Sequence, residues 1–421
     1  MTGRGKTGSF VARRRRSWSV SLLALIVGAS ALAVPLTGGS ASAQSGKSSA
    51  PVVKIGMLAP ITSPTAANPD QGEAFKAAVA AFNKRGGLGT NGARMEAVVC
   101  DTKGDANGEV ACARKLVDEG VVATVNDLAY NNPAGVDEVL QNAGIPRIGL
   151  GSTGVGTTSL SFPLSTGIVG AYMGDAVGFK NQGKSKVVLV RTDAATGAGF
   201  ADFMRPYFKQ AGVDIVGDVA IATGSTDYAP YVAQIQRSNP DAVLFAIDDT
   251  SAAQLIAAMA QLNYKPLLGG HPGTFTLETL QKFKDNTTGT LLAESFPYPS
   301  QSNVKSFPAL KQFFADMKAS KQKILDPKNI QPTSLYPWVS TLAFVNAMKS
   351  TDGTITKDSV IQSLKTGQNI DLMGLAEPWT PSAPGFSVFT GISNPYVYVS
   401  KFDGKNVVTE KKSVDVSQYF K

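Results

Sequence analysis

The sequence has 421 residues, with 40 Lys and Arg against 32 Asp and Glu, and a formal net charge of +8. Residues 1–43 contain six basic residues and no acidic ones, so the formal charge of the remaining chain is only +2. A nearly neutral chain without a basic stripe gives no electrostatic case for a nucleic-acid partner. The 378 residues after residue 43 exceed what one compact core usually holds, which predicts two lobes.

The first 43 residues have the organisation of a secretory signal peptide. Arginines at 13–16 form a basic region, residues 20–36 are largely apolar, and 41–43 offer a small-x-small cleavage site. A membrane anchor is the alternative, but Pro35 and serines interrupt an apolar stretch shorter than about 20 clean residues. The arginines match a twin-arginine signal only loosely. We therefore expect export to the cell envelope, periplasmic or extracellular, with cleavage near Ala43 and a flexible mature N-terminus over 44–51.

The only cysteines are Cys100 and Cys112. In an exported protein, two thiols 12 positions apart predict one local disulfide, which the chain-entropy model values at roughly 2 to 3 kcal/mol. Two buried free cysteines are the alternative. Two sulfurs and one histidine give no basis for a metal site, and we expect neither a metal nor a cofactor.

Strands and helices are predicted to alternate through two successive series. The first has strands 52–58, 94–101, 121–126 and 147–150, with helices 70–84, 108–119 and 133–142. The second begins with helix 171–180 and has strands 186–191, 213–221, 242–247 and 266–269, with helices 199–211, 228–237 and 250–262. Beyond residue 295 the pattern loosens into helices 303–318 and 337–349 and a strand over 396–402. Such alternation is typical of parallel βαβ units.

This pattern predicts an α/β protein with two similar lobes, each built on a parallel sheet. The N-terminal lobe is expected to comprise 52–167 and 296–378, and the C-terminal lobe 168–295 and 379–421. Three hinge crossovers near 165–170, 293–297 and 377–395 would then join the lobes.

Two nucleotide-binding patterns occur in the wrong structural context. Gly149, Gly151 and Gly154 spell G-x-G-x-x-G, but residues 157–163 lack the helical period needed to place a pyrophosphate at a helix start. Asp175, about 20 positions further on, lies in a predicted helix rather than after a strand. Residues 178–185 match the P-loop pattern but leave a helix and enter a strand, so Gly183 is better interpreted as a helix C-cap.

Catalysis finds little support in the sequence. The chain has one histidine, His271, no H-E-x-x-H, and no G-x-S-x-G after residue 43. We therefore expect a binding protein rather than an enzyme.

Polar and glycine-rich loops follow the predicted strands. In parallel α/β lobes ligands bind beyond the carboxyl ends of strands, where this sequence has 60–68, 128–132, 151–154, 192–197, 248–251 and 270–273. Their hydroxyls, amides, carboxylates and glycine N–H groups suit a small polar or zwitterionic ligand. For Asp248 the alternative is a structural role as the N-cap of the following helix.

Five stretches give the chain a strong resemblance to periplasmic binding proteins of the leucine/isoleucine/valine type, the extracellular receptors of amino-acid ABC importers. These stretches are residues 54–62, 82–88, the region of Asp101, 144–148 and 241–245. The resemblance covers nearly the whole chain after the signal peptide, and implies the same type 1 two-lobed fold.

The resemblance also implies which residues bind the ligand. In relatives, the loop matching Gly151, Ser152 and Thr153 holds an α-carboxylate and α-ammonium, whereas this chain departs from the family in the other loops. Tyr130 and Asn131 stand where serines are usual, Thr196 and Asp248 where tyrosines are usual, and His271 where a glutamate binds the ammonium. Asp248 could supply the missing charge; otherwise the ligand is a carboxylate or amide without an ammonium. The candidate ligand-binding residues are Asn68, Tyr130, Asn131, Gly151, Ser152, Thr153, Thr196, Asp248 and His271.

The function expected from this resemblance is delivery of a small polar solute to an ABC importer by hinge closure. The solute would be an amino acid, such as a branched-chain one, or a related carboxylate or amide. A membrane permease and its ATPase are the implied partners, and the protein is expected to be a monomer. The alternative is a ligand-sensing receptor module of the same fold that signals to a membrane partner.

Overall fold

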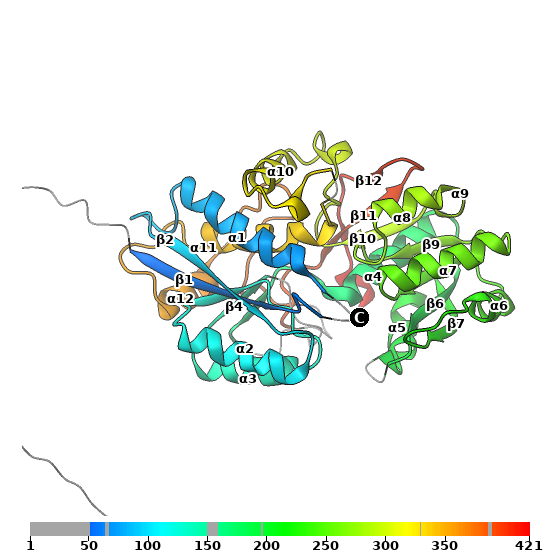
Figure 1. Ribbon diagram of the computed structural model, residues 1–421, viewed down its shortest axis with the longest axis horizontal. Coiled ribbons are helices and arrows are strands. Elements are labelled where there is room, and N and C mark those ends of the chain that lie inside the picture. The colour runs from blue at the N-terminus through cyan, green and yellow to red at the C-terminus, as the bar shows by residue number, and fades with distance from the viewer. Residues whose placement is uncertain (1–50, 64–66, 150–158, 195–196, 329, 386–389) are drawn as a thin grey trace, which may run out of the picture. The chain divides into compact units, whose positions relative to one another are not determined.

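The computed structural model describes residues 51–421 apart from 64–66, 150–158, 195–196, 329 and 386–389 (Figure 1). Its first sheet is parallel and has the strand order β2-β1-β3-β4-β5. The strands are β1 (Val52–Ala59), β2 (Arg94–Asp101), β3 (Ala123–Val125), β4 (Arg147–Gly149) and β5 (Ser161–Pro163). The connecting helices are α1 (Pro69–Lys84), α2 (Ala106–Asp118) and α3 (Pro133–Asn142).

The second sheet combines a parallel half with an antiparallel edge. Its order is β12-β11-β10-β9-β8-β6-β7, with β13 paired to β11. The strands are β6 (Lys186–Thr192), β7 (Asp214–Ile221), β8 (Ala242–Ala246), β9 (Leu267–Gly270), β10 (Leu291–Glu294), β11 (Tyr396–Phe402), β12 (Val407–Thr409) and β13 (Val414–Asp415). The helices are α4 (Gly167–Asn181), α5 (Phe200–Gln210), α6 (Ala229–Arg237), α7 (Asp249–Gln261), α8 (Leu277–Lys282) and α9 (Lys284–Thr287). Strand β11 runs antiparallel to β10 and to β12.

The chain between β10 and β11 packs mainly on the first sheet. It contains α10 (Ala309–Ala319), α11 (Leu335–Ala347) and α12 (Lys357–Thr366), with 3-10 turns at Gln301–Asn303, Lys323–Leu325 and Pro332–Ser334; a further turn, Ser417–Tyr419, follows β13. Helices α10 and α11 lie against α1 (Figure 1). Every residue of α11 from 335 to 344 is buried, because its apolar residues cover the whole helix rather than one stripe.

Both sheets are covered by helices on their two faces, as parallel sheets require. Along β1, Val53, Ile55 and Met57 enter a core with α1, α10 and α11, while Leu58 faces a smaller core with α2 and α3. In Figure 1, α1 and α11 accordingly lie on one side of this sheet and α2 and α3 on the other. Alternate residues of β6 likewise divide between a core with α6 and α7 and one with α4 and α5.

Most predicted helices and strands are present. Their bounds differ from the prediction where a proline sets the start of a helix or where a strand forms by pairing with distant strands. The helix predicted from residue 303 begins at Ala309, because Pro308 occupies its N-cap and a 3-10 turn precedes it. Strand β3 is shorter than predicted. The sequence analysis missed β5, β10, β12, β13, α8, α9 and α12. Among the described residues, no helix is both long and apolar enough to cross a membrane.

The local structure around both nucleotide-like patterns agrees with the prediction that neither is a nucleotide-binding motif. The part of 157–163 that is described forms a turn and β5 rather than a helix. Gly183 follows the end of α4 with a φ of +72°, a backbone conformation typical of glycine just beyond a helix, and β6 starts three residues later. The predicted disulfide is also present, with the Cα atoms of Cys100 and Cys112 5.5 Å apart.

Candidate functional site

The hydroxyl of Tyr336 brings residues of both sheets together. Tyr336 lies on α11, which packs against α1 of the first sheet. Its hydroxyl donates to Glu294 Oε2 at 3.1 Å and lies 3.2 Å from Nε2 of His271. Glu294 ends β10 and His271 follows β9, so both belong to the second sheet. We refer to Tyr336, His271, Glu294, Asp70 and Tyr130 as the Tyr336 cluster.

Contacts at both nitrogen atoms fix the orientation of the His271 ring. The backbone N–H of Gly273 donates to Nδ1 at 3.0 Å, so Nδ1 carries the lone pair and the ring proton lies on Nε2. Nε2 in turn lies 2.5 Å from Glu294 Oε2. The Nε2 N–H group is therefore directed at the carboxylate of Glu294.

Glu294 is buried at the point where the chain crosses between the sheets. Its Oε1 accepts from the N–H of Ser295 at 2.6 Å and from the hydroxyl of Ser165 at 3.4 Å. Burial alone would raise the pKa of Glu294, but contact with His271 and the hydrogen bonds from Ser295 and Tyr336 lower it on balance. The side chain is therefore ionised and held by four donors. Ser165 and Ser295 lie in two of the three predicted crossovers.

A second buried carboxylate, Asp70, lies in the first turn of α1. Its Oδ2 accepts from the hydroxyls of Thr333 and Ser334, each at 2.9 Å. Burial raises the pKa of Asp70 above its ordinary value, although these hydrogen bonds oppose the shift. Burial and Glu294 raise the pKa of Tyr336 most, and Tyr130 and Asp70, which lie near it, raise this pKa further.

Tyr130 is the most exposed member of the cluster. Its side chain is 39% exposed, yet the protein around its hydroxyl, with Asp70 and Glu109, raises its pKa to about 12. Tyr130 is therefore neutral at physiological pH and able to donate a hydrogen bond. The next residue, Asn131, uses its amide group within the protein, donating to the carbonyl of Gly104 at 3.1 Å and to Glu109 at 3.3 Å.

Asp248 is a helix N-cap, the structural role that the sequence offered as the alternative to ligand binding. It is the N-cap of α7, and its two oxygens accept from the N–H of Ser251 at 2.9 Å and its hydroxyl at 2.7 Å. The carboxylate is exposed, and its loop adjoins that of His271, because Thr274 donates to the carbonyl of Ile247. The function of Asp248 in ligand binding stays a prediction.

Of the remaining predicted residues, Asn68 precedes α1 and accepts from the amide of Gln71 at 3.1 Å. Four others lie outside the described residues: Gly151, Ser152, Thr153 and Thr196. Among those described, His271 lies at the hydroxyl of Tyr336, and Tyr130 is near enough to help raise the pKa of Tyr336.

The sequence analysis missed three members of this cluster, Asp70, Glu294 and Tyr336. Asp70 follows Pro69 at a helix start, where an acidic residue has an ordinary explanation. Glu294 offered a signal, because it is the one charged residue in the otherwise apolar stretch 291–294. Tyr336 gave no comparable signal, since its partners are 42 and 65 positions away in the chain.

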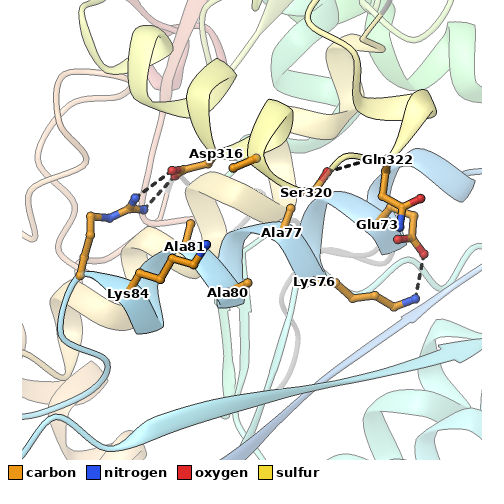
Figure 2. Close-up of a pocket in the computed structure, with 11 residues that line it drawn as sticks. Glu73, Lys76, Ala77, Ala80, Ala81, Lys84, Asp316, Ser320 and Gln322 are labelled. Carbon is orange, nitrogen blue, oxygen red and sulfur yellow. Dashed lines mark hydrogen bonds and ion pairs between the residues drawn. The ribbon is translucent and has the colours of Figure 1, made fainter.

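A surface pocket between α1 and α10 is a structural joint rather than part of this cluster. Figure 2 shows it lined by alanines of α1 and by charged side chains, of which Lys76 pairs with Glu73 and Arg85 with Asp316. Arg85 donates to both oxygens of Asp316 at 2.9 Å, and Lys76 lies 2.8 Å from Glu73. Asp316 also accepts from the indole N–H of Trp338 on α11 at 2.8 Å, so its carboxylate joins three helices.

Comparison with known proteins relates most of the chain to one family. A family model described as a periplasmic binding protein matches residues 52–385. Among curated proteins, the chain is 24% identical to "Leu/Ile/Val-binding protein homolog 3" of Brucella melitensis, over 80% of this chain and 90% of the relative.

Solved structures with the same fold bind different molecules. A branched-chain amino-acid ABC transporter protein from Thermus thermophilus with bound valine is 17% identical, with a TM-score of 0.69, covering 88% of this chain and 98% of that one. A solute-binding protein from R. palustris in complex with 4-hydroxybenzoate is 19% identical, with a TM-score of 0.68, covering 86% and 97%. The chain therefore has the α/β fold with two parallel-sheet lobes.

Proposed function

Since the chain belongs to the periplasmic binding protein family, we propose that it is the exported solute-binding protein of an ABC importer. It binds a small polar solute between its lobes and presents the loaded form to a membrane permease with its ATPase. The relatives named for Leu, Ile and Val binding support this assignment.

The observation that carries the proposal is the Tyr336 cluster. It places polar groups from both sheets around one hydroxyl, at the ends of parallel strands where α/β proteins bind ligands. A solute that contacts both sheets is bound more tightly when the lobes are closed, and this differential affinity drives hinge closure. We place the lobe boundaries at 52–167 with 296–378 and at 168–295 with 379–421, so that Glu294 lies at a crossover.

The proposed solute is an amino acid, such as a branched-chain one, or a related carboxylate or amide. The imidazole of His271 offers no negative charge to an ammonium group, and both Asp248 oxygens accept hydrogen bonds from Ser251. For this reason the proposal includes a carboxylate or amide that has no ammonium group beside the amino acids. The same fold accommodates valine in one relative and 4-hydroxybenzoate in another.

A thermal-shift screen tests the proposal with L-leucine, L-valine, 4-hydroxybenzoate and benzamide. A solute present at 100 times its Kd stabilises the folded state by about 2.7 kcal/mol, so a true solute raises Tm clearly. Failure of every amino acid, carboxylate and amide to raise Tm would contradict the ligand class. Binding combined with unchanged uptake in a deletion strain would instead support the receptor alternative.

A further inference from the structure

The chain between Cys100 and Cys112 lies between two of the ligand-binding loops predicted for the first lobe. The disulfide joins the end of β2 to the second turn of α2 and so closes this segment into a loop. We name residues 100–112 the disulfide brace. On one side the brace contacts loop 60–63 after β1, and on the other it contacts loop 129–132 after β3, which carries Tyr130.

Glu109, on the α2 part of the brace, holds the backbone of the Tyr130 loop. Its side chain is buried, with only 1% exposed. The carboxylate accepts from the N–H groups of Tyr130 at 2.8 Å, Asn131 at 3.0 Å and Asn132 at 2.6 Å. Three consecutive N–H groups that converge on one point form a concave site of the kind that binds anions. Here the protein supplies the anion from its own helix.

Asp101, at the end of β2, likewise accepts hydrogen bonds from backbone N–H groups of the loop after β1. Its Oδ1 accepts from the N–H groups of Ile61 at 3.0 Å and Thr62 at 3.2 Å, and its Oδ2 accepts from the Thr62 hydroxyl at 2.5 Å. The two carboxylates therefore act from the two ends of one short covalent loop.

Gly104, in the middle of the brace, contacts both loops. Its carbonyl accepts from the amide of Asn131, and a Cβ at this position would lie 2.3 Å from Oγ of Ser63. Its φ of +72° also favours glycine.

We propose that the disulfide brace sets the first-lobe binding loops in place before the solute arrives, and that Glu109 is the positioning residue for Tyr130. Glu109 occupies the three N–H groups that could otherwise hold a solute carboxylate, so the solute contacts the Tyr130 side chain instead. The contact between the solute and Tyr130 rests on the proposed function, whereas the positioning of the loop by Glu109 does not.

Amide hydrogen exchange tests the positioning without any solute. In the wild-type protein the amides of residues 130–132 are protected, and in Glu109→Ala they exchange at least about tenfold faster. Sodium formate, a small carboxylate, fills the vacated position in Glu109→Ala and restores protection in a saturable manner. Unchanged exchange in Glu109→Ala, or accelerated exchange that formate does not reverse, would overturn the role.

Two further variants separate positioning from general destabilisation. Glu109→Gln keeps the side-chain volume but replaces one acceptor oxygen with an NH2 group, so residues 130–132 exchange at an intermediate rate and do not respond to formate. Asp118→Ala removes an exposed acid from the same helix and leaves this exchange unchanged. Faster exchange in Asp118→Ala as well would show that any damage to α2 has the same effect.

Removal of the disulfide tests the brace as a whole. With Cys100→Ser and Cys112→Ser together, exchange increases at residues 61–62 and 130–132, whereas residues 188–190 in the second sheet stay protected. A uniform increase across both sheets would overturn the proposal. Calorimetry with L-leucine and 4-hydroxybenzoate adds a functional readout: the solute that binds the wild type binds Glu109→Gln at least about fivefold more weakly at similar Tm. If neither binds the wild type, the proposed ligand class fails, and the exchange data still decide the positioning role.

Discussion

Asp175 shows how strongly burial acts on a single residue. It lies on α4 with no exposed surface, and neither carboxylate oxygen has a hydrogen-bond partner of good geometry among the described residues. Burial raises the pKa of Asp175 well above its ordinary value, and nearby Glu294 raises it further. The native state therefore keeps this proton at a pH where the unfolded chain has released it.

The sign of the resulting pH dependence follows from the proton count. Because the folded protein binds more protons at Asp175, the free energy of unfolding falls as the pH rises above about 4, the unfolded-state pKa of an aspartate. Asp175→Asn removes this titration, so the variant should lose less stability than the wild type as the pH rises from about 4. Asp70 and Glu294 remain in both proteins, so the difference reports Asp175. Urea unfolding at several pH values measures it, with Asp118→Asn as the exposed control, and parallel curves would contradict the prediction.

Asp248 can be tested for charge separately from capping. Asparagine caps helices about as well as aspartate, so Asp248→Asn should change the free energy of unfolding by less than about 0.5 kcal/mol. If Asp248 pairs with a solute ammonium, the variant loses L-leucine binding and keeps any 4-hydroxybenzoate binding. Calorimetry of both solutes decides, and equal L-leucine affinity in variant and wild type would remove Asp248 from the site.

At the scale of elements, the joint between α1, α10 and α11 depends on one carboxylate. Asp316 accepts from Arg85 and Trp338, whereas Lys76 and Glu73 pair within α1 alone (Figure 2). Asp316→Ala leaves the Trp338 N–H and the Arg85 guanidinium without this acceptor.

We expect Asp316→Ala to lower the free energy of unfolding by about 1–3 kcal/mol, because it strands donors at a partly buried joint. Lys76→Ala removes a surface ion pair of the same pocket and should cost about 0–0.5 kcal/mol. Urea denaturation of both variants checks this difference. Similar losses in the two would show that the Asp316 network contributes no more than a surface pair.

Elements with strong periodicity were predictable, and short ones were not. The bounds of β2 and β11 and the start of α3 at Pro133 agree with the sequence analysis, since alternating apolar residues and a helix-starting proline are local signals. Strands β5 and β10 have three and four residues and acquire their structure by pairing with β4 and with β9 and β11. No local pattern distinguishes such a segment from a loop.

For the whole molecule, the chain passes between the sheets after β5, after β10 and before β11. The hydrogen bond from the N–H of Thr166 to Oγ of Ser295, at 2.8 Å, joins two of these passages directly. Hinge closure would therefore bend segments that contact one another and the buried Glu294.

The predicted signal peptide can be tested by the mass of the exported protein. If the predicted signal peptide is cleaved near Ala43, residues 1–43 and their six basic residues would be removed from the exported protein. Intact-mass spectrometry of the exported protein measures this, with the cytoplasmic precursor as the reference. An exported protein that retains residues 1–43 would contradict cleavage and favour the membrane-anchor alternative.

Local patterns were sufficient to predict the α/β class, the two lobes, a disulfide between Cys100 and Cys112, and the failure of both nucleotide-binding patterns to lie in the required structural context. Each depends on local spacing or on composition, which survive without the fold. Tertiary structure alone decided that Tyr336, His271 and Glu294 meet, and that Glu109 binds three backbone N–H groups. Such contacts join residues that are tens of positions apart in the chain. Their contribution to the free energy of folding depends on burial, which the sequence does not reveal.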